Sequence, residues 1–154
     1  MSGQADFTDD EWTEITEAPL EVMVTMFAAG QHGPISTIKE SSAGAHAITQ
    51  PGNRGAASGL IAEIVPIAQG KEARHDVGHP HGDSVADLIQ GCLDRLGPAA
   101  TALGKLPADE RSEVGAWLVD IAVAVAKAAK GVSDGERETI AKIAAIFGVT
   151  APEV

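Results

Sequence analysis

Aromatic side chains are nearly absent from this chain, and their absence constrains how its core can be built. The 154 residues include three Phe, two Trp and no Tyr, although 44% of the residues are hydrophobic. Ala, Val, Ile and Leu must therefore fill the core. Side chains of this size favour closely packed helices over the thick interior of a β-sandwich. A chain of about 150 residues buries roughly 70% of its unfolded surface, which is enough for a core without disulfides or structural metal.

Apolar residues recur at helical spacing along most of the sequence, most strongly in the range 107–131. Thr8 with Glu11, and Ser133 with Glu136, have the spacing of a capping box, which marks a helix start. The pattern predicts helices in the ranges 8–17, 20–29, 36–47, 60–65, 84–96, 98–106, 107–131 and 133–148.

Three prolines fall inside or between these patterns. Pro19, Pro66 and Pro98 lack the amide hydrogen that a helix interior needs, so we expect a kink or a break at each. No alternating β-branched run bounded by hairpin turns is present. The sequence therefore predicts an all-α fold, a compact bundle of about six to seven helices in one domain. Its expected parts are N-terminal helices in 7–50, loops in 51–59 and 69–83, and C-terminal helices in 84–149.

The charge balance excludes two classes of partner. The chain has 22 acidic and 11 basic side chains, a formal charge of −11, and no cluster of Lys or Arg. Phosphate backbones and anionic membranes are bound through basic side chains. We therefore expect no nucleic acid and no membrane, and instead a protein partner or a homo-oligomer. The first residues lack the basic and apolar regions of a signal peptide, so a cytoplasmic location is predicted.

Two single residues are candidates for chemistry. Cys92 is the only cysteine, and its apolar helical setting indicates a buried structural thiol. Asp120 interrupts an apolar helix. It would need a partner if buried, or else its pKa would rise; alternatively it lies on the exposed edge of the helix with Lys127 and Lys130, which is the interpretation we prefer. No nucleophile elbow or phosphate loop is present, so we predict no catalytic residue and no cofactor.

The densest group of possible metal ligands lies between residues 75 and 83. Imidazoles and carboxylates of the kind that Zn²⁺ or Ni²⁺ prefers are supplied there by His75, His79, His81 and Asp83. Short stretches rich in His, Gly and Pro are also common as solvated linkers, and the spacing matches no metal motif of defined geometry. These four residues are the candidate ligands of a divalent metal. We expect 70–83 to be irregular, mostly exposed, and free of any metal that folding requires.

One local pattern occurs twice: an apolar helix, a glycine turn, Ile-Ser or Val-Ser, and an amphipathic helix. The copies lie at 27–36 and 125–136. This pattern resembles the tellurite-resistance TerB-like helical domains, mainly over roughly the last forty residues. The resemblance implies two related helical halves and a metal-ligating acid before the glycine. Here that position holds His32 in the first copy and Lys130 in the second.

Two functions of different classes follow as hypotheses. The first is a non-enzymatic helical interaction or stress-response module, also acting as a homo-oligomer, because the helix 20–29 is apolar nearly all round and needs cover. The acidic face from Asp9 to Glu17 would suit a basic partner, or would only keep the domain soluble. The alternative is a metal-binding or metal-sensing TerB-like protein, with ligands from the His75–Asp83 segment or from Asp134 and Glu136.

Overall fold

The computed structural model describes residues 2–30, 34–73, 84–128 and 131–154. Within these ranges the chain forms six α-helices and two short 3-10 helices, and no strand. The elements are η1 (Gln4–Asp6), α1 (Asp9–Gly30), α2 (Pro34–Thr49), η2 (Gly55–Ala57), α3 (Ser58–Ala73), α4 (Val85–Leu103), α5 (Ala108–Ala128) and α6 (Asp134–Ile146). The predicted all-α bundle of about six to seven helices is confirmed.

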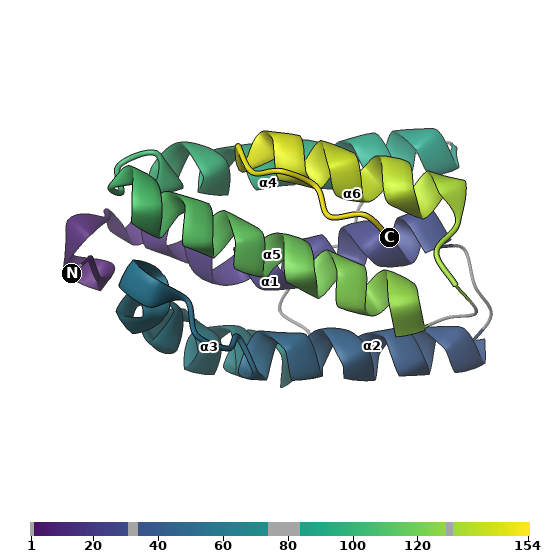
Figure 1. Cartoon of the computed structure of the whole chain (residues 1–154), viewed down its shortest axis with the longest axis horizontal. Helices are drawn as coiled ribbons and strands as arrows, with labels where there is room; N and C mark the ends of the chain where they lie inside the picture. Colours follow the sequence, from purple (N-terminus) through teal and green to yellow (C-terminus); the bar gives the residue numbers. More distant parts are fainter. Residues whose placement is uncertain (1, 31–33, 74–83, 129–130) are drawn as a thin grey trace.

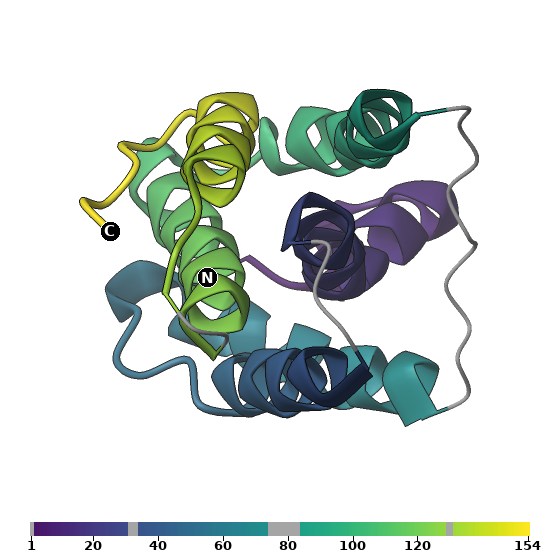
Figure 2. The same ribbon diagram turned by 90° about the vertical axis from the view of Figure 1, so that its right-hand side faces the viewer.

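The helices lie in three layers (Figures 1 and 2). In Figure 2, α4 and α6 form the upper layer, α5 and α1 the middle layer, and α2 and α3 the lower layer. The middle layer is covered on both sides, and α1 packs against each of the other five α-helices. Among the described helices, none has both the length and the apolar character that a membrane span requires.

The apolar part of α1 is covered by the bundle itself. Leu20, Val22 and Met26 are at most 3% exposed because neighbouring helices surround them. The sequence argument for a homo-oligomer rested on this helix lacking cover. That cover is present within one chain, so α1 gives no reason to expect an oligomer.

A small-residue face brings α2 close to its neighbours. A Cβ added to Gly44 would lie 2.7 Å from the Met23 side chain of α1, a distance at which something must shift. Nearby, the Trp117 indole nitrogen of α5 donates a hydrogen bond to the Ala47 carbonyl at 3.4 Å. Gly44 therefore leaves room for the Met23 side chain, and a larger residue there would force that side chain to move.

The helices do not break at the three prolines, whereas a kink at each stays a prediction. α1 continues through Pro19, α3 through Pro66 and α4 through Pro98. A proline inside a helix costs about 3 kcal/mol, whereas burial of one large apolar side chain contributes roughly 1.5–3 kcal/mol. Buried apolar residues flank each proline in pairs, at Ala18 and Leu20, Ile64 and Ala68, and Leu96 and Ala99. Burial of these side chains against neighbouring helices opposes the cost of each proline, and all three helices continue through it.

Helix starts agree better with the sequence than helix lengths do. The Thr8 hydroxyl accepts from the Glu11 amide at 3.2 Å, and the Glu11 carboxylate accepts from the Thr8 amide at 3.1 Å, which confirms the capping box. However, α2 begins at Pro34 rather than at residue 36, and α3 spans Ser58–Ala73. Parts of the expected loops 51–59 and 69–83 are thus helical, and residues 74–83 lie outside the described residues.

Gly115 provides a test of the packing between α5 and the C-terminal segment. An added Cβ would lie 2.9 Å from Val149 Cγ1 and 3.2 Å from Phe147 Cβ. Gly115→Ala should therefore lower the free energy of unfolding by about 1–3 kcal/mol, although Ala favours a helix over Gly by up to about 1 kcal/mol. In the control Gly135→Ala, the added Cβ meets only the Ser133 hydroxyl, at 4.0 Å. Urea unfolding compares the two, and equal stabilities would contradict this packing.

Candidate functional site

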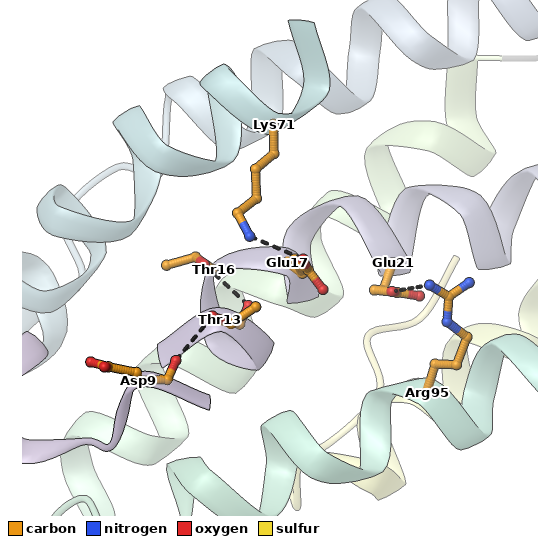
Figure 3. Close-up of polar contacts among 7 residues, drawn as sticks. All are labelled: Asp9, Thr13, Thr16, Glu17, Glu21, Lys71 and Arg95. Carbon is orange, nitrogen blue, oxygen red and sulfur yellow. Dashed lines mark hydrogen bonds and ion pairs between the residues drawn. The ribbon is translucent and has the colours of Figure 1, made fainter. Parts of the chain in front are cut away.

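The middle of α1 carries a buried carboxylate that the sequence analysis overlooked. The Glu21 side chain is 7% exposed, and its Oε1 pairs with the Arg95 guanidinium of α4 at 2.8 Å (Figure 3). Its other oxygen, Oε2, is buried without a hydrogen-bond partner. A buried polar atom without a partner costs about 1–3 kcal/mol. Glu21 is therefore the strongest candidate for a functional side chain.

Two acids one turn apart connect α1 to both outer layers of the bundle. Glu17 pairs with Lys71 of α3 at 3.0 Å, and Glu21 pairs with Arg95 of α4 (Figure 3). Residues four apart lie on the same side of a helix, so the two ion pairs hold α1 between α3 and α4. The Thr16 hydroxyl, which is also buried, donates to the Thr13 carbonyl of its own helix at 3.1 Å.

A shallow groove of about 330 Å³ lies beside Glu21, between α1 and α4. It is lined by Glu14, Glu17, Glu21, Asp94, Arg95 and Pro98. Four carboxylates therefore face one guanidinium. Asp94 is exposed at the rim, where it accepts a hydrogen bond from the Gln90 side-chain Nε2 at 2.8 Å. The groove has an excess of negative charge.

The surroundings of Glu21 raise its pKa from an ordinary 4.5 to about 7. Burial is the main cause, since it penalises the charged form, and the charges of Glu17 and Glu14 act in the same direction. Arg95 opposes the shift. At neutral pH, Glu21 is thus divided between its charged and protonated forms, and a small change in the groove's charge shifts that balance.

Cys92 lies against the same interface as a buried thiol, as the sequence predicts. Burial raises its pKa, and the charge of Glu21 raises it further, while a hydrogen bond with Thr25 and the charge of Arg95 lower it. Reactive cysteines have lowered pKa values and an accessible sulfur. Cys92 has neither property, so its environment is that of a structural residue.

Asp120 is on the exposed edge of α5, as predicted. It forms an ion pair with Arg54, which lies just before η2 and 66 residues away in the sequence. Lys127, expected on the same edge, is exposed, and Lys130 lies outside the described residues. The contact with Arg54 was not predicted from the sequence.

The candidate metal ligands His75, His79, His81 and Asp83 lie outside the described residues. Within the described ranges, no three His, Cys, Asp or Glu side chains are grouped so that they could hold a metal ion. Asp134 instead pairs with Arg137 at 2.9 Å, and a Glu136 oxygen accepts from the Ser133 amide at 3.0 Å. These two acids near the second TerB-like turn therefore serve the start of α6.

Comparison of the chain with protein-family models, with curated proteins and with solved structures gave no match. The TerB-like resemblance and its two related halves stay a prediction. What the groove binds has to be inferred from its own residues, namely a surplus of carboxylates around a partly charged, buried Glu21.

The raised pKa of Glu21 predicts a specific dependence of stability on pH. The folded state holds the proton more tightly than the unfolded state, so Glu21's contribution is fully present below about pH 4.5 and is lost as pH rises through about 7. The loss is on the order of 2–3 kcal/mol. Glu21→Gln keeps an acceptor for Arg95 and removes the titration, so this loss should be absent from the variant.

The measurement is urea unfolding of the wild type and Glu21→Gln between pH 4.5 and 8. Glu153→Gln, which removes an exposed carboxylate near the chain end, is the control for net charge. The stability difference between wild type and Glu21→Gln should change with pH, and the difference between wild type and the control should not. If the stability difference between wild type and Glu21→Gln does not change with pH, the pKa of Glu21 is not raised in the folded state.

The histidine-rich segment generates a second prediction, which concerns metal and folding. The described core is extensive, and folding should not depend on a metal at His75, His79 and His81. Thermal unfolding with and without a chelator, repeated on the triple variant with these residues changed to Ala, should give melting temperatures within a few degrees. A drop of more than about 10 °C on chelation, which corresponds to several kcal/mol, would make metal binding the leading hypothesis.

Proposed function

We propose that this chain is a non-enzymatic helical interaction module whose groove between α1 and α4 binds a basic segment of a protein partner. The observation that supports this most directly is Glu21, a buried carboxylate with one oxygen unpartnered at the wall of a groove rich in acids. A Lys or Arg side chain entering the groove would compensate the excess charge there. It would also favour the ionised form of Glu21.

The charges at the rim suit recognition of a flexible basic peptide. Glu17 and Glu21 of the groove each pair with a basic side chain. Glu14 and Asp94 also line the groove, and neither forms an ion pair with a Lys or Arg of the described residues. An exposed ion pair contributes about 0.2–1 kcal/mol, so two of them guide a partner without binding it irreversibly. Affinity of this kind decreases as salt is added.

Support for a non-enzymatic role comes from the environment of Cys92. Cys92 is fully buried with a raised pKa. Nucleophilic catalysis needs a thiol or hydroxyl activated by a neighbouring base or by a lowered pKa. Burial, and then the charge of Glu21, raise the pKa of Cys92 instead of lowering it, which disfavours such chemistry.

Proton release gives this proposal a sharp test. A cationic side chain beside Glu21 should lower its pKa below 7, so binding at pH 7 should release a fraction of a proton. We expect the enthalpy of binding a Lys- and Arg-rich octapeptide to differ between phosphate and Tris buffers, which have different ionisation enthalpies. Isothermal titration calorimetry measures this difference, and Glu21→Gln should abolish it.

Two double variants test whether the peptide binds in the groove. Glu14→Gln combined with Asp94→Asn removes two rim charges and should weaken the peptide about tenfold. The matched control, Glu138→Gln combined with Glu153→Gln, removes two exposed charges from α6 and the C-terminal segment. Equal weakening by both double variants would mean that the peptide senses only net charge, and it would rule out the groove as the site. Co-purification from native cells would then identify the partner.

A further inference from the structure

The first described residues are held against the bundle by carboxylates. Three consecutive backbone amides each donate a hydrogen bond to an acid: Ser2 to Glu110 of α5 at 3.2 Å, Gly3 to Asp6 of η1 at 2.8 Å, and Gln4 to Glu63 of α3 at 2.9 Å. A Cβ added to Gly3 would lie 3.1 Å from Glu63 Oε1, so the backbone lies tightly against α3. The segment therefore has one defined position on the bundle.

Glu110 differs from the other two acids because it is buried. Its residue is 4% exposed, and both of its oxygens accept from Ser2, Oε1 from the backbone nitrogen and Oε2 from the hydroxyl. Within the ranges that the structure describes, Glu110 forms no ion pair with a Lys, Arg or His. Buried carboxylates usually have a partner of opposite charge, so this one lacks a full counter-charge.

The start of α5 supplies only part of that counter-charge. Glu110 lies in the first turn of the helix, where the backbone dipole is equivalent to roughly +0.5 elementary charge. The other two side chains that bind the segment, Asp6 and Glu63, add negative charge. The surroundings of Ser2 therefore offer enough hydrogen-bond acceptors but too little positive charge.

The atom best placed to supply the missing charge is the Ser2 nitrogen. It lies 3.2 Å from Glu110 Oε1, which is already within the distance of an ion pair. As part of a peptide bond this nitrogen is neutral and has one hydrogen to donate. As the first nitrogen of a chain it would be an ammonium group with three hydrogens, because α-amino groups have an ordinary pKa of about 7.7–8.0.

We propose that the mature protein begins at Ser2 and that its α-ammonium group forms an ion pair with the buried carboxylate of Glu110. Hydrolysis of the peptide bond between Met1 and Ser2 releases this group. The C–N bond breaks, the carbonyl carbon of Met1 takes the oxygen of water, and the Ser2 nitrogen becomes the ammonium. The proposal concerns this bond alone, whichever residues precede Met1, and it does not depend on the groove at Glu21.

The first test is the chemical nature of the chain start. N-terminal sequencing of protein purified from its native cells should begin at Ser2, and intact mass should show that the amine carries no added group. A chain that begins at another residue, or one in which the Ser2 amine is acetylated, would overturn the proposal.

The second test compares two forms released from a cleavable fusion, one that begins at Met1 and one that begins at Ser2. At pH 7 the Ser2 form should melt several degrees higher, because only its ammonium lies opposite Glu110. The facing carboxylate raises the pKa of the amine in the folded state. The advantage should therefore be lost as pH rises above about 9. Nα-acetylation of the Ser2 form, which keeps an N–H but removes the charge, should also remove it.

Two neighbouring acids provide matched variants. Glu110→Gln keeps an acceptor for Ser2 and removes the charge, so the two forms should then melt at the same temperature. Asp109→Asn changes an exposed acid in the same helical turn and should leave their difference intact.

Three results would contradict the ion pair. The first is equal melting of the Met1 and Ser2 forms of the wild type at pH 7. The second is a difference between the two forms that persists in Glu110→Gln, since the gain would then come from the loss of Met1 alone. The third applies even if Glu110→Gln does not fold: an acetylated Ser2 form that melts with the unmodified one shows that the charge has no role.

Discussion

The packing of α1 against the surrounding helices is the contact on which the rest of the bundle depends. α1 lies in the middle layer, and its contact with α4 is the most extensive between any two described elements. Aliphatic side chains make up most of this core, and Gly44 of α2 leaves room for the Met23 side chain of α1. Because α1 touches every other α-helix, each of them buries part of its apolar face against the same helix. A single element therefore organises the core.

Glu21 places a titratable charge inside this central interface. A fully apolar residue would be easier to bury, because a buried ion pair often contributes no net stability. The carboxylate is instead held between Arg95, which favours its charge, and the burial and neighbouring acids that oppose it. The outcome is a group that is balanced near neutral pH, next to a groove. A buried carboxylate with a shifted pKa beside a groove is more typical of a binding site than of a core.

Features that depend on a few neighbouring residues were predicted correctly from the sequence, whereas contacts between distant helices were not. Both capping boxes and the buried Cys92 follow from short segments and agree with the structure. Helix breaks were expected at the prolines because the local cost of proline is visible in the sequence, whereas the burial that opposes this cost depends on other helices. Asp120 was a candidate because it is an acid within an apolar helix. Glu21 stands in the same kind of setting between Leu20 and Val22, but its partner Arg95 is far along the chain.

The central position of α1 has a consequence for how the chain emerges during synthesis. α1 is made before α4, whose covering residues follow roughly seventy residues later. At about 5–20 residues per second, translation takes several seconds to deliver them. Throughout that interval α2 and α3 can cover their side of α1, but the surface that packs against α4 stays exposed. Any protein that binds exposed apolar surface would compete with α4 for this side of α1 until α4 has been made.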